Sequence, residues 1–132
     1  MRTFVLDTCG LLPIVFRVRD LTRLGRAIVE LAQDYQAELV VPTMALVEAE
    51  REIRRRQERT NRTFADFLAA IMAADYMRIE PLATEQVALL PQLLAIPDMH
   101  DRVIVAHALT NDAPLMTNDY HIRDSGLVET VW

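Results

Sequence analysis

The chain has 132 residues, of which 52% are hydrophobic and 25% are charged, so it can bury a core and is expected to form a single domain over residues 1–132. All 14 basic residues are Arg, which disfavours P-loop enzymes, Schiff-base enzymes, kinases and receiver domains, because each of these relies on a Lys at its site. The net charge of −5 means that contact with nucleic acid would require a local basic patch.

The first half of the chain alternates short apolar runs with longer amphipathic ones. The run TFVL favours β-structure and ends at Asp7, which indicates a buried first strand. Apolar residues recur at steps of three and four from Leu21 to Leu31, which predicts a helix with Asp20 as its N-cap. In chain order we predict a strand over 3–6, a helix over 20–36, a strand over 39–41 stopped by Pro42, and helices over 43–58 and 63–75.

The second half continues the same alternation. We predict a strand over 77–79, a helix over 84–94 that Pro91 kinks or splits, a helix over 97–109, and short strands over 115–116 and 128–131. Short apolar strands that alternate with helices predict an α/β fold with three layers, in which helices cover both faces of a central parallel sheet. In such sheets ligands bind at the carboxyl ends of the strands, so chemistry is expected there.

The single cysteine and the start of the chain place limits on the class of protein. One Cys, Cys9, excludes an internal disulfide and a zinc site built from several Cys, and it fits a reducing compartment. The first residues lack the order of a secretory signal, and no apolar run approaches the roughly 20 residues that a membrane-spanning helix needs. We therefore expect a cytoplasmic protein that does not engage a membrane.

Acidic residues gather at the predicted strand ends. Asp7 directly follows the first strand, Asp119 follows the fourth, and Asp98 and Asp101 share a face in the first turn of the helix over 97–109. Each has a structural alternative, because Asp98 and Asp101 could stabilise a helix N-terminus and Asp119 could be a turn residue. Asp7 is harder to explain structurally, since a carboxylate at the end of a buried strand has a desolvation cost that something must offset.

Glu48 differs from the glutamates that follow it. Glu50 and Glu52 each have an Arg four residues later, a favourable helical pairing. Glu48 instead has Glu52 at that position and lies in the apolar stretch ALVEA, with Arg51 as its one nearby helical partner of opposite charge. Glu48 is therefore expected to find a partner outside its own helix.

A cluster of these carboxylates would favour a divalent cation. Neighbouring carboxylates repel one another and raise one another's pKa, and a hard cation removes that cost. Oxygen ligands favour Mg²⁺ or Mn²⁺ over Zn²⁺, and His100 and His107 lie two helical turns apart, about 10 Å, too far to share one metal ion. The residues alone thus indicate a metal-dependent phosphoryl-transfer or phosphodiester site.

Six Arg residues fall within twelve positions at the end of the helix over 43–58 and just beyond it. They could form a solvated helix end with internal ion pairs, or they could bind a phosphate backbone. Under the second interpretation Arg54, Arg55 and Arg59 are the candidates for contact with RNA or with a protein partner.

Four motifs now stand in order along the chain: VLDTCGLL, VPTMALVEAE, PDMHDRVIVAHAL and APLMTNDYHIRDSG. Together they resemble the motifs of PIN-domain proteins, and most of all the single-domain ribonuclease toxins of bacterial toxin–antitoxin pairs of the virulence-associated protein C type. The resemblance places the family's four acids on Asp7, Glu48, Asp101 and Asp119. It gives accessory roles to Thr8, Asp98 and Thr117. One departure is Met99-His100 after Asp98, where many relatives have Pro and an aromatic residue.

The resemblance implies the sheet order 3-2-1-4-5, a Mg²⁺ or Mn²⁺ site, a homodimer, and inhibition by a small antitoxin whose C-terminal segment crosses the active site. The function it implies is a metal-dependent endoribonuclease that hydrolyses RNA with metal-activated water. Two alternatives remain open at this point. One is a PIN fold that binds RNA or protein without cutting, although none of the acids is missing here. The other is a receiver- or phosphatase-like domain, which the absence of Lys disfavours.

Overall fold

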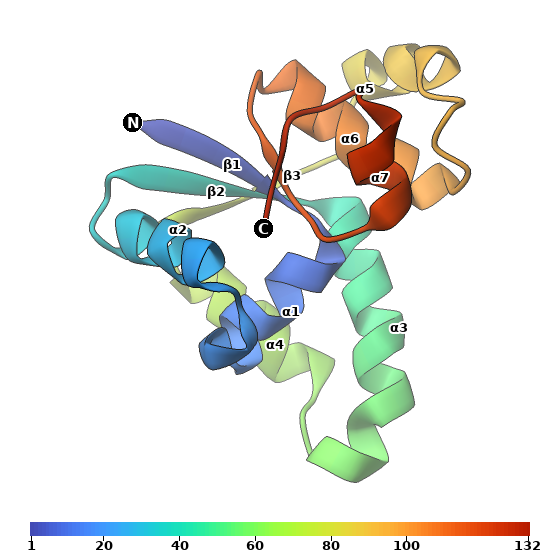
Figure 1. Cartoon of the computed structure of the whole chain (residues 1–132). Helices are drawn as coiled ribbons and strands as arrows, with labels where there is room; N and C mark the ends of the chain where they lie inside the picture. Colours follow the sequence, from blue (N-terminus) through green and yellow to red (C-terminus); the bar gives the residue numbers. More distant parts are fainter.

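A five-stranded parallel sheet forms the centre of the molecule (Figure 1). The computed structural model describes residues 1–57 and 60–132. The strand order is β3-β2-β1-β4-β5, as predicted. Because β1 is central, the segments that follow β1, β2 and β4 meet at one end of the sheet. The strands are β1 (Arg2–Leu6), β2 (Ala37–Pro42), β3 (Met77–Glu80), β4 (Leu115–Met116) and β5 (Thr130–Val131).

Helices cover both sides of this sheet, which confirms the predicted three-layer α/β class (Figure 1). One layer holds α1 (Thr8–Phe16), α2 (Arg23–Gln33) and α4 (Phe64–Ala73), and α3 (Thr43–Thr60) runs away from the end of β2 alongside α1. The opposite layer holds α5 (Thr84–Leu89), α6 (Met99–Thr110) and α7 (Tyr120–Ser125). Two 3-10 turns, η1 (Val18–Asp20) and η2 (Leu90–Gln92), follow α1 and α5.

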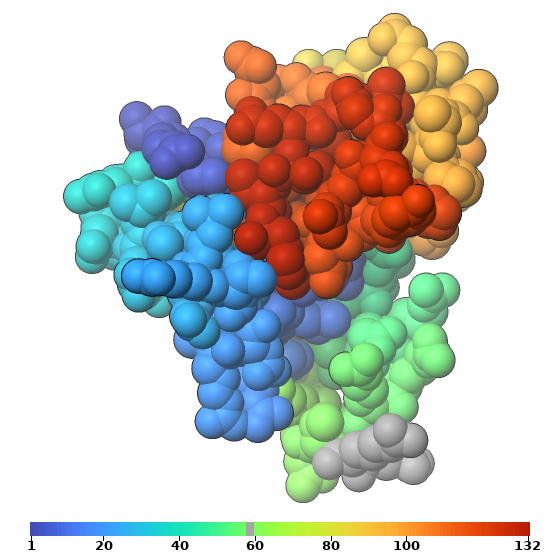
Figure 2. All heavy atoms as spheres, in the orientation of Figure 1, coloured from blue at the N-terminus to red at the C-terminus, as the bar shows by residue number. Residues whose placement is uncertain are grey.

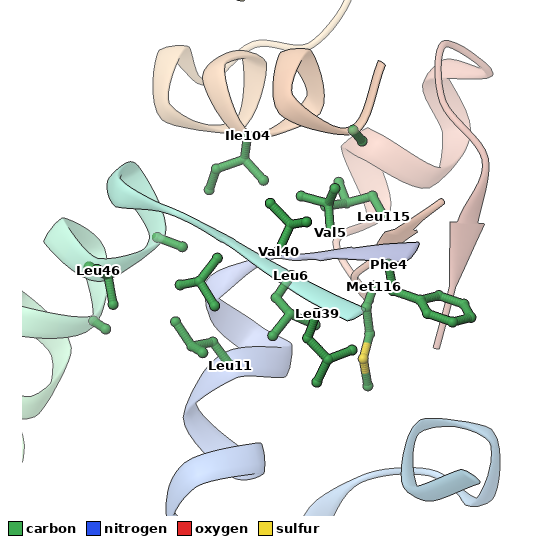
Figure 3. Close-up of a cluster of buried hydrophobic side chains, with 14 of the residues drawn as sticks. Phe4, Val5, Leu6, Leu11, Leu39, Val40, Leu46, Ile104, Leu115 and Met116 are labelled. Carbon is green, nitrogen blue, oxygen red and sulfur yellow. The ribbon is translucent and has the colours of Figure 1, made fainter. Parts of the chain in front are cut away.

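The core lies on both faces of the central strands (Figure 3). Successive side chains of a strand point to opposite faces, so Val5 faces Ile104 of α6 while Leu6 faces Leu11 of α1. All four side chains are fully buried. From Phe4 to Leu6 both faces of β1 are therefore apolar, as expected of a strand covered by helices on each side, and Asp7 follows directly as a buried polar residue.

The helix that the sequence placed over 20–36 begins later than predicted. Its N-cap is Thr22, whose Oγ1 accepts a hydrogen bond from the Gly25 N–H at 3.1 Å. Asp20 lies in η1 and does not cap α2, so that prediction was wrong. The helix over 84–94 is split as predicted, because Pro91 lies in η2 after α5 ends.

Helices α1 and α7 were not predicted. Each is short and follows an Asp that serves as its N-cap, Asp7 for α1 and Asp119 for α7. Both residues stood out in the sequence as acids at strand ends, and in the structure each also caps the helix that follows it.

In the layer that holds α1, α2 and α4, helix α2 packs closely against β4. A Cβ atom at Gly25 of α2 would lie 2.9 Å from Cε of Met116, so a larger residue there would require the end of the Met116 side chain to shift. Figure 2 shows α2 lying next to the C-terminal residues on this face of the molecule. Among the described residues, no helix is both long enough and apolar enough to cross a membrane.

Candidate metal centre

Three carboxylates from distant parts of the chain meet at the C-terminal end of the sheet. Asp7 follows β1, Glu48 lies in the second turn of α3, and Asp101 lies in the first turn of α6. One oxygen of each lies within 4.8 Å of the others. Three carboxylates at this separation repel one another unless a cation lies between them.

Asp7 is the most buried of the three, with 5% of its surface exposed. Its Oδ1 accepts the Thr8 N–H at 2.7 Å, and its Oδ2 accepts the Thr117 hydroxyl at 2.7 Å and the Cys9 thiol at 3.5 Å. Burial nevertheless raises the pKa of Asp7 above its ordinary value; the three donors oppose the rise and the charge of Asp119 adds to it. Hydrogen bonds therefore orient this carboxylate without fully compensating its charge.

Glu48 finds partners outside its own helix, which confirms the expectation from the sequence. Its Oε1 accepts the Thr8 hydroxyl at 2.9 Å, and its Oε2 lies 3.6 Å from Nδ1 of His100. Burial raises the pKa of Glu48, and the negative charges of Asp7 and Asp98 raise it further. Thr8 thus links the first two acids, since its N–H binds Asp7 and its hydroxyl binds Glu48.

The charged form of Asp101 is strongly disfavoured in this cluster. Burial and, after it, the negative charges of its acidic neighbours, Asp7 first, together raise its pKa to about 7. Among the described residues, none donates a hydrogen bond to the Asp101 carboxylate or forms an ion pair with it. A bound cation would therefore stabilise the charged form of Asp101 more than that of Asp7 or Glu48, which already accept hydrogen bonds from the chain.

Asp98 and Asp119 lie outside the group of three, and each begins a helix. Asp98 Oδ1 accepts the N–H groups of His100 at 2.8 Å and Asp101 at 3.1 Å. Asp119 Oδ1 accepts the Ile122 N–H at 3.1 Å. Both still raise the pKa of Asp101 by their charge. Both residues therefore cap a helix, and the same two carboxylates add negative charge near Asp101.

The ligand atoms that the cluster offers fit a hard divalent cation. The three clustered groups offer carboxylate oxygens only, the ligand type that Mg²⁺ and Mn²⁺ prefer. Cys9 is the one soft group beside them, but burial and the charge of Asp7 raise the pKa of its thiol to about 12. The thiol therefore stays protonated and acts as a donor to Asp7.

The Arg-rich end of α3 is largely paired within the helix. Arg54 lies 2.9 Å from Glu50, and Arg55 and Arg56 lie 4.0 and 2.8 Å from Glu52. The pairs of Arg54 and Arg56 are those expected from the sequence. Of the residues proposed to contact RNA or a partner, Arg54 lines a groove beside Glu48, whereas Arg59 lies outside the described residues.

Sequence reasoning missed two neighbours of the cluster, His100 and Cys9. In the sequence, His100 stood out as a candidate zinc ligand with His107 and as a departure from the family motif, and Cys9 only as evidence against a disulfide and a zinc site built from several Cys. The signal for both was adjacency, because His100 directly precedes Asp101 and Cys9 is two residues from Asp7.

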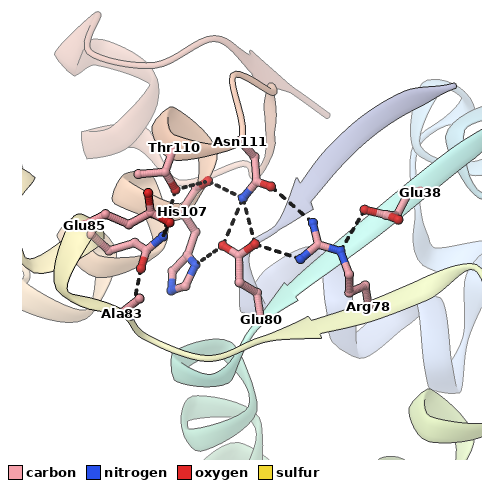
Figure 4. Close-up of polar contacts among 9 residues, drawn as sticks. Glu38, Arg78, Glu80, Ala83, Glu85, His107, Thr110 and Asn111 are labelled. Carbon is pink, nitrogen blue, oxygen red and sulfur yellow. Dashed lines mark hydrogen bonds and ion pairs between the residues drawn. The ribbon is translucent and has the colours of Figure 1, made fainter.

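A second polar cluster lies at the end of β3, around Glu80 (Figure 4). The Glu80 carboxylate binds Nδ1 of His107 at 2.6 Å, Nδ2 of Asn111 at 3.0 Å and a guanidinium nitrogen of Arg78 at 2.9 Å. Arg78 also binds Glu38 at 2.9 Å. Burial would raise the pKa of Glu80, but these hydrogen bonds outweigh it and lower the pKa. Glu80 is thus satisfied by the chain itself.

The fold is similar to solved structures of toxin–antitoxin proteins. VapBC2 from Rickettsia felis, solved with a promoter DNA fragment, matches with a TM-score of 0.75 at 14% identity, over 98% of each chain. A toxin–antitoxin complex from Klebsiella pneumoniae gives 0.65 at 14% identity, over 96% of this chain and 95% of the other. VapC20 from Mycobacterium tuberculosis, described as a toxin that cleaves the sarcin-ricin loop, gives 0.61 at 14% identity, over 96% and 98%.

No curated protein sequence matches the chain. At these levels of identity the structural likeness establishes the fold alone. The family comes from a separate comparison, in which the model of the PIN domain matches residues 4–126. That match spans all four sequence motifs, and the strand order and the acidic cluster agree with it. The chain therefore belongs to the PIN domain family.

Proposed function

We propose that this protein is a metal-dependent endoribonuclease and the toxin of a toxin–antitoxin pair. The observation that carries the proposal is the group formed by Asp7, Glu48 and Asp101, whose oxygens lie within 4.8 Å of one another. All three have raised pKa values. A cluster of charges that the chain does not compensate is suited to a divalent cation and, through it, to a phosphate of the substrate.

Each residue has a distinct part in this proposal. Asp7, Glu48 and Asp101 hold Mg²⁺ or Mn²⁺, directly or through water, and Asp119 adds negative charge beside them. When bound, such a cation supplies Lewis acidity toward a phosphate oxygen and an activated water for hydrolysis. Thr117 and Thr8 fix the orientation of Asp7 and Glu48 through their hydroxyls. Asp98 sets the start of α6 and with it the position of Asp101.

The likeness to toxin–antitoxin structures supports an antitoxin as a partner. We propose that a small antitoxin binds this chain, that two copies form a homodimer, and that the substrate is RNA. Arg54, Arg55 and Arg59 are proposed to contact RNA or the antitoxin, because guanidinium groups bind phosphate and carboxylate in a bidentate manner.

The test is cleavage of end-labelled RNA by the purified protein in Mn²⁺ and in chelator. We expect cleavage only with the metal, and products with 5′-phosphate and 3′-hydroxyl ends, because water rather than the RNA 2′-hydroxyl is the nucleophile. Glu48→Gln and Asp101→Asn should each lower the rate by more than about 100-fold, the upper end of what losing a supporting residue of a metal site costs.

Asp124→Asn is the matched control, since Asp124 is an exposed acid on α7 outside the cluster. Its rate should equal that of the wild type. Products with a 2′,3′-cyclic phosphate, or full activity in chelator, would contradict the metal mechanism. Tight binding of RNA by the wild type without any cleavage would instead favour a binding module.

A further inference from the structure

A groove of about 590 Å³ lies directly beside the acidic cluster. It runs along α3 and is bordered by the start of α4 and the start of α6. Glu48 of the cluster lines the groove, and so does His100, whose Nδ1 lies 3.6 Å from the Glu48 carboxylate. Leu46, Val47 and Phe64 supply its apolar lining. We refer to it as the α3 groove.

Of the three apolar residues of the lining, Leu46 is buried, Phe64 is partly buried and Val47 is exposed to solvent. Val47 is 61% exposed although it is a large apolar residue adjacent to Glu48. The His100 side chain is 35% exposed, and its ring is held beside Glu48. The Phe64 ring packs on Phe67 at 5.9 Å between centroids, which anchors it in the core. The groove thus offers apolar and ring surfaces fixed by the fold, within contact of a candidate metal ligand.

The edge of the α3 groove is cationic. Arg51 and Arg54 line it, one helical turn apart, together with Glu50. Arg54 is paired with Glu50, but no described carboxylate forms an ion pair with Arg51. An anionic group at this edge would therefore gain a guanidinium partner without breaking an existing ion pair of Arg51.

We propose, on the basis of the function proposed above, that the α3 groove is a nucleobase subsite for single-stranded RNA. It takes the unpaired base of the nucleotide adjacent to the phosphate at the acidic cluster, and Arg51 binds the next phosphate along the strand. A single strand presents flat apolar bases and anionic phosphates in alternation, as do the apolar lining and the cationic edge of this groove. Bases stacked within a duplex could not enter, so the substrate is an unpaired segment.

The experiment compares the binding of two ligands of equal charge. One is a short oligouridylate, and the other is an abasic ribose-phosphate oligomer of the same length. Both are titrated in Mg²⁺ against the Asp7→Asn variant, in which turnover is blocked, with fluorescence anisotropy as the readout. We expect the abasic oligomer to bind about five- to tenfold more weakly, the range for loss of one stacked base.

The quantity compared is the ratio of the Kd of the abasic oligomer to the Kd of the oligouridylate. Adding Val47→Asn to Asp7→Asn should reduce this ratio to near one, because the polar amide removes the apolar contact. Val47 is exposed, so the variant should fold, as a melting curve can verify. Met72→Gln is the matched control, since Met72 is 71% exposed on α4 and does not line the groove. It should leave the ratio unchanged.

A ratio near one before Val47 is changed, or a ratio that Val47→Asn does not alter, overturns the proposal. If Val47→Asn turns a dimer into a monomer with the ratio unchanged, the groove is an interface between two copies instead. If it leaves the ratio unchanged but abolishes binding of an antitoxin peptide, the groove holds protein. The nuclease proposal is judged separately by cleavage in the wild-type protein, so the two failures are distinguishable.

Discussion

Glu80 and the acidic cluster lie at the same end of this sheet, but the described part of the chain supplies hydrogen-bond partners to compensate the charge of Glu80 and does not do so for Asp101. Glu80, at the end of β3, has the side chains of His107, Asn111 and Arg78 as partners, and its pKa is lowered (Figure 4). Asp101, in the cluster with Asp7 beyond the end of β1, has no described donor at its carboxylate, and its pKa is raised to about 7. The comparison shows that burial alone does not identify a site, because the decisive difference is whether the chain supplies the compensating donors.

The largest expected effect concerns added metal. At a free concentration 100 times its Kd, Mn²⁺ should stabilise the wild type by about 2.7 kcal/mol, a rise of about 10 °C in Tm. Asp101→Asn should gain much less, whereas Glu80→Gln should keep the full gain. Melting curves in chelator and in Mn²⁺ measure this. A full gain in Asp101→Asn together with a lost gain in Glu80→Gln would reverse the comparison.

The second prediction concerns the cluster that the chain compensates itself. Glu80→Gln should lower the free energy of unfolding by about 2 kcal/mol, because an amide NH₂ meets the donors of Arg78 and Asn111 in place of a carboxylate oxygen. Urea unfolding in chelator gives the value. Glu30→Gln is the control, an exposed glutamate on α2 that should change stability by less than about 0.5 kcal/mol. Cleavage by Glu80→Gln should match the wild type.

A third prediction tests the hydroxyl that orients Asp7. Thr117→Val removes the donor to Asp7 and the acceptor of the Asp119 N–H. We expect cleavage to fall by about tenfold, as for other supporting residues of metal sites. Thr117→Ser retains the hydroxyl and should restore most of the rate. Equal losses in both variants would mean that the methyl group and its packing matter, not the hydrogen bond.

The smallest effect is the dependence of metal-free stability on pH. The native pKa of Asp101 lies above its ordinary value of 3.8, so the native state binds this proton more tightly than the unfolded state does. Its contribution therefore lowers stability as pH rises from about 4 to about 7. In chelator, the Tm of Asp101→Asn relative to the wild type should increase over this window by a few degrees. A difference that stays constant with pH would show that Asp101 is already compensated.

Much of the fold was predictable because the signals are local. Alternating apolar runs gave the strands, and Pro91 gave the break after α5. Helices α1 and α7 escaped because they are short, and α1 has a Pro and a Gly inside it. Asp7 and Asp119 were interpreted as site acids, with a turn as the alternative for Asp119, and their role as helix N-caps was not predicted.

The candidate site was predictable in part, for a different reason. Parallel strands bring their carboxyl ends to one edge, so acids after β1 and β4 and in the helices near that edge could be placed together. Partners that depend on tertiary packing could not be placed. The Glu80–His107 pair spans two elements 27 residues apart, and His100 reaches Glu48 across the gap between α6 and α3. No local pattern specifies such distances.

The hydrogen bond between Thr117 and Asp7 has a consequence for when the acidic cluster forms during folding. It joins residues 110 positions apart, so the loop it closes includes most of the chain, and closing it carries a large entropic cost. An intermediate with only β1, β2 and α3 in place can bring Thr8 to Glu48, 40 positions away, but lacks Asp101 and the hydroxyl that holds Asp7. The complete cluster is therefore present only when nearly all of the chain has folded, and opening β4 alone removes the hydroxyl that orients Asp7.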